Sequence, residues 1–245
     1  MAEGPAPRYR RILLKLSGEA LAGEGKAPLD AQVLRLVAQE VREVTAAGVQ
    51  VAIVVGGGNF VRGEEVSRRL GLHEVTGHTM GMLATVMNAL ALQDVMEREG
   101  LVTRVLSAVE MHQVAEPFIR RRAIRHLEKG RVVIFAGGTG SPYFTTDTAA
   151  ALRAIEVEAD ALLMAKRGVA GVYDKDPRTH PDAVLFRRLD YMELLNRDLR
   201  VMDATAVALA RDNAMDIIVF DVAVPGNIRR AVLGEEIGTL VGGRR

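Results

Sequence analysis

Three short glycine-rich segments, each directly after a strand-like apolar run, constrain the fold of this chain most. They are residues 15–19, 56–59 and 137–142. A glycine cluster at the carboxyl end of a buried strand lets the backbone approach an anion closely, and the N–H groups of a following helix face the same anion. Three such turns would surround more phosphate than one mononucleotide carries. The pattern therefore predicts a protein that holds two phosphorylated ligands end to end.

Strand-like and helix-like segments alternate along the chain. The expected strands are 12–14, 51–55, 103–106, 131–135, 161–164 and 216–220. The expected helices are 30–48 with Asp30 as N-cap, 79–98, 117–129, one that opens near Asp147 with Thr145 or Thr146 as cap, 204–213 and 226–233. This alternation predicts an α/β fold, a three-layer α/β/α sandwich with a mostly parallel central sheet. With 245 residues and 49% hydrophobic content, we expect a flexible N-terminus over 1–8 and a single domain over 9–245.

Composition excludes several classes of function. Lys and Arg total 32 against 31 Asp and Glu, so no net charge indicates a nucleic-acid partner. The basic stretch 117–129 lacks interleaved aromatics and is more typical of a solvated face or a subunit contact. No cysteine is present, which excludes disulfides and fits a reducing compartment, and no stretch is apolar enough for a signal core or membrane span. We expect a cytoplasmic protein without membrane or nucleic-acid partners.

Competing motifs fail residue by residue. No Gly-x-x-x-x-Gly-Lys-Ser/Thr string occurs, and a dinucleotide fingerprint that starts at Gly56 meets Val61 where its last glycine belongs. His-Glu-x-x-His and Gly-x-Ser-x-Gly strings are also absent, and the five histidines are scattered. Phosphoryl transfer remains, because it needs charge neutralisation and alignment but little covalent chemistry from the protein.

Four charged residues at expected strand or helix ends are candidates for that chemistry. Lys15 is placed to bridge phosphate oxygens, with a solvated edge lysine as the alternative. Arg62 is in reach of the same anion unless it is a surface arginine at the start of a helix. Asp147 either orients groups at a helix N-terminus or simply caps it. Asp203 holds Lys15 or a metal, or is an N-cap. Their joint occurrence favours a functional site.

Five strings match a known family. They are residues 12–21, 55–59, 80–88, 138–147 and 201–203. With them the chain resembles the bacterial uridylate kinases (UMP kinases) of the amino acid kinase superfamily over residues 9–241. The lysine–glycine start and the triple glycine are shared across that superfamily, whereas the Met-Gly-Met-Leu-Ala-Thr and Phe-Thr-Thr-Asp strings distinguish the UMP branch.

The resemblance implies the amino acid kinase fold and transfer of the γ-phosphate of ATP to UMP, giving UDP, in pyrimidine nucleotide biosynthesis. Mg²⁺ would accompany ATP, with no direct protein ligand assigned. The implied catalytic residues are Lys15, Arg62, Asp147 and Asp203, with Asp203 orienting Lys15 and Asp160 joining Asp147 in organising lysines and metal-bound water. The implied ATP-binding residues are Lys15, Leu16, Ser17, Gly18, Gly58, Arg62, Arg167, Tyr173 and Asp176. The implied UMP-binding residues are Gly57, His78, Thr139, Gly140, Ser141, Pro142, Tyr143, Phe144, Thr145 and Thr146.

Three positions depart from the family pattern. His78 stands where an Asp usually accepts hydrogen bonds from the ribose hydroxyls, and a neutral imidazole accepts one such bond rather than two. Ser141 replaces an Asn near the base, and Arg167 replaces an Asn or Thr, where it would stack on adenine or point to water. We expect weaker recognition of the UMP ribose or a rearranged contact.

The resemblance also implies a homohexamer activated by GTP and inhibited by UTP. Asp94 and Arg104 resemble positions of the GTP site, while Gln93 departs from the Arg seen in some relatives. Two alternative functions stay open: another superfamily kinase acting on a carboxylate or carbamate, and a catalytically silent nucleotide-binding regulator. The UMP-specific strings weigh against the first, and the presence of Lys15, Asp147 and Asp203 weighs against the second.

Overall fold

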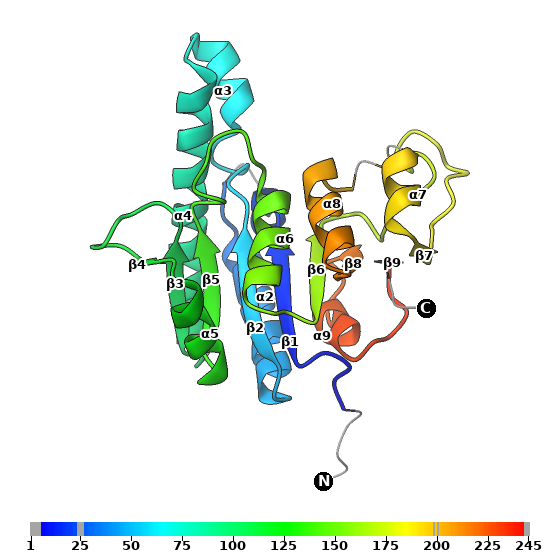
Figure 1. The fold of residues 1–245 in the computed structure, drawn as a ribbon, viewed down its shortest axis with the longest axis horizontal. Coiled ribbons are helices and arrows are strands. Elements are labelled where there is room, and N and C mark those ends of the chain that lie inside the picture. The colour runs from blue at the N-terminus through cyan, green and yellow to red at the C-terminus, as the bar shows by residue number, and fades with distance from the viewer. Residues whose placement is uncertain (1–5, 24–26, 198, 200, 243–245) are drawn as a thin grey trace.

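The computed structural model describes residues 6–23, 27–197, 199 and 201–242. Within them one sheet runs in the order β4-β3-β5-β2-β1-β6-β8-β9-β7 (Figure 1). Its strands are β1 (Arg11–Leu16), β2 (Gln50–Val55), β3 (Thr103–Ser107), β4 (Glu116–Pro117), β5 (Val132–Ala136), β6 (Ala161–Lys166), β7 (Arg188–Leu189), β8 (Asp216–Asp221) and β9 (Thr239–Val241). Neighbouring strands pair in parallel except β8 with β9. The predicted mostly parallel sheet is confirmed.

Helices cover both faces of the sheet. They are α1 (Gly18–Leu21), α2 (Ala31–Ala46), α3 (Gly63–Leu70), α4 (Glu74–Arg98), α5 (Arg120–Glu128), α6 (Thr146–Glu156), α7 (Tyr191–Asn196), α8 (Ala204–Asp212) and α9 (Asn227–Val232). One apolar core packs α2, α4 and α9 on the sheet, and a second packs α5, α6 and α8 on the other face. Leu13 and Leu14 are adjacent in β1 yet belong to opposite cores, because successive side chains of a strand point to opposite faces. The three-layer sandwich is confirmed.

Several elements differ from the sequence expectations. Helix α4 begins at Glu74 rather than Thr79, and α5 begins at Arg120 because Pro117 belongs to β4. Helix α3 was not among the expected helices, although a helix that starts at Arg62 was the alternative interpretation of that residue. Its only buried residue is Ser67, so it shows no apolar period. Figure 1 shows α3 and the first turns of α4 projecting beyond the carboxyl ends of the strands.

The ends of the chain are described only in part. Residues 1–5 and 243–245 lie outside the described residues, so only residues 6–8 of the expected flexible segment 1–8 are described. Within that segment, the Arg8 backbone N–H donates to the Val232 carbonyl of α9 at 3.0 Å. That residues 9–245 form a single domain stays a prediction. Among the described helices, none combines the length and apolar character needed to cross a membrane.

Candidate active site

The three glycine segments meet at one edge of the sheet. They follow β1, β2 and β5, which are neighbours in the sheet, and the carboxyl ends of parallel strands lie on the same side. The first two segments touch, because a Cβ added to Gly56 would lie 2.9 Å from the Gly18 backbone nitrogen. One added to Gly57 would lie 2.7 Å from the Gly81 carbonyl of α4. Only residues without a side chain fit there. The turns therefore present backbone rather than side chains to one shared space.

An ion-pair cluster in which Lys15 is buried and its two partners are partly buried lies beside these turns. Lys15 Nζ, on β1, lies 2.5 Å from Asp147 Oδ1, at the start of α6. Lys166 Nζ, at the end of β6, lies 3.8 Å from Asp147 Oδ2. The Lys15 side chain is only 6% exposed, so it is not the solvated edge lysine of the alternative interpretation. Asp147 Oδ1 is itself buried and accepts no well-directed hydrogen bond, so its interaction with Lys15 is an ion contact.

Lys166 was missed by the sequence reasoning, which ended the strand at Met164. β6 continues two residues further and pairs with β1, so Lys15 and Lys166 emerge from neighbouring strands. The signal available was a second lysine at the end of an apolar strand. Burial lowers the pKa of Lys166, Asp147 partly offsets this, and the nearby charge of Lys15 lowers the pKa further. Two lysines that share one carboxylate leave net positive charge for a phosphate.

Asp203 holds the start of α6 rather than Lys15. It is the N-cap of α8, where it accepts from the Ala206 backbone N–H at 2.9 Å. It also accepts from the Thr145 hydroxyl at 2.5 Å and the Thr148 hydroxyl at 2.9 Å. Thr145 in turn caps α6 and accepts from the Asp147 backbone N–H at 3.0 Å. The expected direct contact with Lys15 is not formed among the described contacts. Asp203 is linked to Asp147 through Thr145, and its negative charge partly counteracts the burial that lowers the pKa of Lys166.

The expectation for Asp160 is wrong. This residue precedes β6, and its carboxylate accepts from the backbone N–H groups of Arg10 and Arg11 at 2.7 and 2.9 Å. The length of the strand separates it from Lys166 by about 20 Å, at about 3.3 Å per residue. Asp160 therefore ties the amino ends of β1 and β6 together and organises no lysine of the site.

Arg62 stands at the rim. It is the N-cap residue of α3, and its guanidinium lies 2.6 Å from the Glu19 carboxylate of α1. Both side chains are about half exposed or more, so this ion pair is weak and easily exchanged for a phosphate. Glu19 also sits over Gly58, where an added Cβ would press against its carboxylate. Arg62 is thereby held at the mouth of the glycine turns.

The ion-pair cluster separates two hollows. A cavity of about 770 Å³ is lined by Lys15, the glycines 56–58 and Arg62, and a cavity of about 150 Å³ adjoins it beside Gly57 and Thr146. On the other side of Asp147, a cavity of about 390 Å³ is lined by Lys166, Asp203 and apolar residues. Those apolar residues are Leu194, Leu195, Leu199, Val201, Met202 and Val207. Such an arrangement allows two ligands to meet at the lysines.

The expected UMP residues divide into two groups. His78, Tyr143, Phe144, Thr145 and Thr146 line the large cavity, and Gly57 lines both that cavity and the small one. The imidazole of His78 packs against the Tyr143 ring with centroids 4.8 Å apart.

The second group, residues 139–142, forms hydrogen bonds within its own turn. The hydroxyl of Thr139 accepts from the Ser141 backbone N–H at 3.1 Å and donates to the Ser141 carbonyl at 3.2 Å. A Cβ on Gly140 would lie 3.1 Å from the Ala108 carbonyl. Thr139, Gly140, Ser141 and Pro142 are not among the residues that line the three cavities.

The expected ATP residues are also split. Lys15, Ser17, Gly18, Gly58 and Arg62 line the large cavity, and Leu16 is buried at the end of β1.

The other three lie apart from the cavities. The Arg167 guanidinium donates to the Ala22 carbonyl and is partly exposed. Tyr173 forms an isolated β-bridge with Leu185. Asp176 accepts from the Arg178 backbone N–H at 2.9 Å, the plain turn that the sequence also allowed. The structure does not bring these residues to the described cavities.

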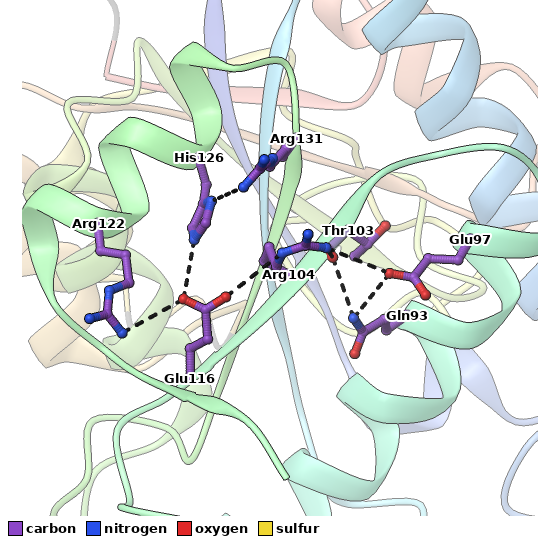
Figure 2. Close-up of polar contacts among 8 residues, drawn as sticks. All are labelled: Gln93, Glu97, Thr103, Arg104, Glu116, Arg122, His126 and Arg131. Carbon is purple, nitrogen blue, oxygen red and sulfur yellow. Dashed lines mark hydrogen bonds and ion pairs between the residues drawn. The ribbon is translucent and has the colours of Figure 1, made fainter. Parts of the chain in front are cut away.

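Asp94 and Arg104 are not brought together. Asp94 pairs with Arg98 on the same helix at 2.7 Å. Arg104, on β3, donates to the Thr103 carbonyl at 2.6 Å and approaches Glu97 and Glu116 at 3.9 and 3.8 Å. Figure 2 shows Arg104 within a polar cluster between α4, β3, β4 and α5. The other members are Gln93, Arg122, His126 and Arg131.

No cluster of three or more His, Asp or Glu side chains that could hold a metal occurs among the described residues. The nearest carboxylates are already engaged: Asp147 by two lysines, and Asp203 by two hydroxyls and a backbone N–H. A Mg²⁺ ion bound mainly through substrate phosphates and water fits this site better than one held by a protein cage.

A mostly parallel α/β/α sandwich, with glycine turns and a Lys–Asp–Lys cluster between two cavities, defines a phosphotransferase outside the P-loop class. The model of the amino acid kinase family matches residues 10–221. The chain belongs to the amino acid kinase family.

Relatives within the family are similar over nearly the whole chain. A uridylate kinase of Rubrobacter xylanophilus is 60% identical over 232 residues, which is 95% of this chain and 91% of the relative. The crystal structure of a UMP kinase from Bacillus anthracis is 40% identical with a TM-score of 0.93 and covers 96% of each chain. A UMP kinase from Ureaplasma parvum is 35% identical with a TM-score of 0.90 and covers 96% of this chain and 100% of its own. The fold prediction is thereby confirmed.

Proposed function

We propose that this protein transfers the γ-phosphoryl group of ATP to UMP, giving UDP and ADP, in pyrimidine nucleotide biosynthesis. One observation carries the proposal: Lys15, Asp147 and Lys166 form a largely buried cationic cluster between two cavities, at the point where three glycine turns meet. The similarity to proteins named uridylate kinase and UMP kinase supports UMP as the acceptor.

The residues act by electrostatics and positioning. In the loose transition state of phosphoryl transfer, charge spreads over the equatorial oxygens, and fixed cations and N–H groups stabilise it. Lys15 and Lys166 supply the cations, and Asp147 holds both ammonium groups in place. Backbone N–H groups at Gly18 and Gly58 add donors that need no reorganisation. When bound, Mg²⁺ neutralises the donor phosphates; it arrives with ATP and is assigned no protein ligand.

The two ligands take opposite sides of the cluster. UMP fits the side of Gly57, His78 and the segment 143–146, with Arg62 released from Glu19 to meet its phosphate. The adenine of ATP fits the apolar cavity beside Met202. The resemblance implied Tyr173 and Asp176 as ATP-binding residues. In the proposed placement, the adenine does not contact them.

Assembly and regulation are part of the proposal. Leu83 and Met87 of α4 are 43% and 51% exposed on one helix face, which supports contact between subunits of a homohexamer. GTP and UTP are proposed as effectors, although Arg104 already faces Glu97 and Glu116, and these carboxylates compete with any phosphate there. The absence of cysteine supports a cytoplasmic location.

A panel of acceptors tests the proposed function. ADP release is measured from the purified protein with ATP and Mg²⁺, with UMP, CMP, carbamate or acetylglutamate as acceptor. Selective turnover with UMP supports the proposal. Turnover with carbamate or acetylglutamate instead would assign another reaction of the family. Tight ATP binding without turnover of any acceptor would favour a nucleotide-binding regulator.

A further inference from the structure

The Met-Gly-Met-Leu-Ala-Thr string and the Asn88 that follows it lie on α4, and the proposed chemistry gives no role to Thr85 or Asn88. Both side chains are polar yet buried, with 2% and 0% of the residue exposed. They are three residues apart, so they share one face of the helix. Burial of a polar side chain lowers the stability of the fold unless the side chain is hydrogen-bonded. Both Thr85 and Asn88 have hydrogen-bond partners in the glycine turns.

Asn88 grips the second glycine segment. Its Nδ2 donates to the Gly56 carbonyl at 2.7 Å and to Asn59 Oδ1 at 2.7 Å. In return, Asn59 Nδ2 donates to Asn88 Oδ1 at 3.0 Å and to the Pro28 carbonyl at 2.7 Å. All four amide hydrogens of the pair are used. The segment from Gly56 to Asn59 is therefore fastened at both ends by one reciprocal amide pair.

Thr85 grips the third glycine segment. Its Oγ1 accepts from the Gly137 backbone N–H at 2.8 Å and donates to the Met82 carbonyl of its own helix at 2.6 Å. Gly137 has φ of 75°, in the left-handed region, so its N–H direction is specific to this turn. Removal of the hydroxyl would leave that buried N–H without a partner. The turn would then relax or rotate to find one.

The first glycine segment is held indirectly, through its contacts with the second segment. Gly56 packs on Gly18, where an added Cβ would lie 2.9 Å from the Gly18 nitrogen, and the Gly56 N–H donates to the Leu16 carbonyl at 2.8 Å. Asn88 thus fixes a backbone segment that in turn fixes the strand end that carries Lys15. One face of one helix braces all three turns.

We propose that Thr85 and Asn88 are positioning residues: from one face of α4 they set the direction of the backbone N–H groups in the turns that receive the two phosphorylated ligands. The inference rests on the proposed function and adds to it how the phosphate-binding backbone is pre-organised. The two residues act at different places. Asn88 acts on the turn beside Lys15, where the transferring group sits. Thr85 acts on the turn that borders the acceptor cavity.

Two matched pairs of variants test the proposal. Thr85→Val removes the hydroxyl at nearly constant volume, whereas Thr85→Ser keeps it. Asn88→Asp loses the donor to Gly56, whereas Asn59→Asp adds a carboxylate to the same amide pair and leaves that donor in place. For each variant, kcat and KM for UMP, the melting temperature and the amide exchange rate of Gly137 are measured.

We expect distinct signatures. Thr85→Val raises KM for UMP roughly tenfold and speeds exchange of the Gly137 amide, and Thr85→Ser restores both, because a small misplacement of binding groups is costly in rate. Asn88→Asp lowers kcat by roughly 10- to 100-fold. Asn59→Asp lowers it less.

The outcomes separate the two claims. Thr85→Val with the KM and amide exchange of the wild type, or Thr85→Ser as impaired as Thr85→Val, would overturn the positioning role of Thr85. An Asn88→Asp variant no slower than Asn59→Asp would overturn that of Asn88. If Asn88→Asp does not fold, an Asn59→Asp variant with the kcat of the wild type would overturn it, because the amide pair would then be dispensable. Absence of UMP turnover in the wild type would instead overturn the proposed function, while the exchange of Gly137 still reports on the brace.

Discussion

Asp147 Oδ1 lies 2.5 Å from Lys15 Nζ, and its second oxygen lies 3.8 Å from Lys166 Nζ, so one partly buried carboxylate holds two ammonium groups from neighbouring strands. Strands β1 and β6 determine the spacing of the lysines, and the N-terminus of α6 determines the position of the Asp147 carboxylate. Because α6 is capped by Thr145, which Asp203 fixes in turn, the position of the cluster depends on α8 as well.

Replacement of Lys15 is expected to affect turnover far more than binding. Lys15→Ala should lower kcat by roughly 10²- to 10³-fold, comparable with the loss of one preorganised donor to a developing charge. UMP affinity should change little, because the charge that Lys15 meets develops in the transition state. Steady-state kinetics and UMP titration measure the two effects. Lys129→Ala, at the exposed end of α5, is the matched control, and equal losses of turnover and folding in Lys15→Ala would refute the role.

Lys166 should make stability depend on pH in the alkaline range. Its pKa is lowered in the folded protein, mainly by burial, so between that lowered pKa and the unfolded value of about 10.4 the unfolded chain binds more protons. Stability contributed by Lys166 therefore rises with pH through this window. We expect the free energy of unfolding of the wild type to increase relative to Lys166→Met between neutral and alkaline pH, in denaturant titrations. A difference that falls with pH would contradict the lowered pKa.

Glu40 of α2 should be a stability residue remote from the site. Its buried carboxylate accepts from the backbone N–H groups of Gly226 and Ile228 at 2.8 and 2.9 Å, at the start of α9. Glu40→Ala leaves both donors unpaired, so we expect a loss of about 1–3 kcal/mol per donor at most in unfolding free energy. Glu43→Ala, exposed on the same helix, should cost little. Equal effects of the two substitutions would show that the hydrogen bonds from Glu40 to the start of α9 do not contribute to stability.

The same residue has a pH signature of opposite sign to that of Lys166. Burial raises the pKa of Glu40, and the two backbone donors only partly offset this. An acid whose folded pKa is raised stabilises most below the unfolded pKa of about 4.3, and that contribution is lost as pH rises through the folded pKa. The advantage of the wild type over Glu40→Gln should therefore shrink from acid toward neutral pH in thermal unfolding.

His78 is expected to limit recognition of the UMP ribose. Its imidazole packs on Tyr143 at the wall of the large cavity and accepts at most one hydrogen bond when neutral. His78→Asp restores the residue usual in the resembled family, so KM for UMP should fall severalfold while KM for 2′-deoxy-UMP changes less; each hydrogen bond is worth about 1 kcal/mol. Unchanged KM values for both nucleotides would show that His78 does not face the ribose.

The six longer strands and the glycine turns could be predicted because local sequence carries them, whereas the two- and three-residue strands β4, β7 and β9 were not expected. The apolar runs of β1, β2 and β5 are buried on both faces, and the glycines that follow them mark the turns. The mostly parallel sheet, and the end of it where ligands bind, could therefore be predicted directly. Helix α3 could not be assigned from periodicity, because its charged residues show no apolar face, and only the alternative interpretation of Arg62 placed a helix start there.

The contacts of the site needed the tertiary structure. Asp203 was expected beside Lys15 but meets Thr145 and Thr148 across helices that are 55 or more residues apart in the chain. Asp160 was expected at the site but lies at the amino end of β6, since an Asp before a strand and a Lys at its last position mark opposite edges of the sheet. Lys166 was missed because the expected strand ended too early.

The destination of the transferred phosphoryl group tests the central claim most directly. ³¹P NMR of the purified protein with ATP, Mg²⁺ and UMP follows the γ-phosphate through time. The account predicts that the γ signal of ATP is lost as the β signal of UDP appears in equal amount, with no release of inorganic phosphate, and that Lys15→Ala slows this exchange. Loss of the γ signal to inorganic phosphate without UDP, or no loss at all, would contradict it.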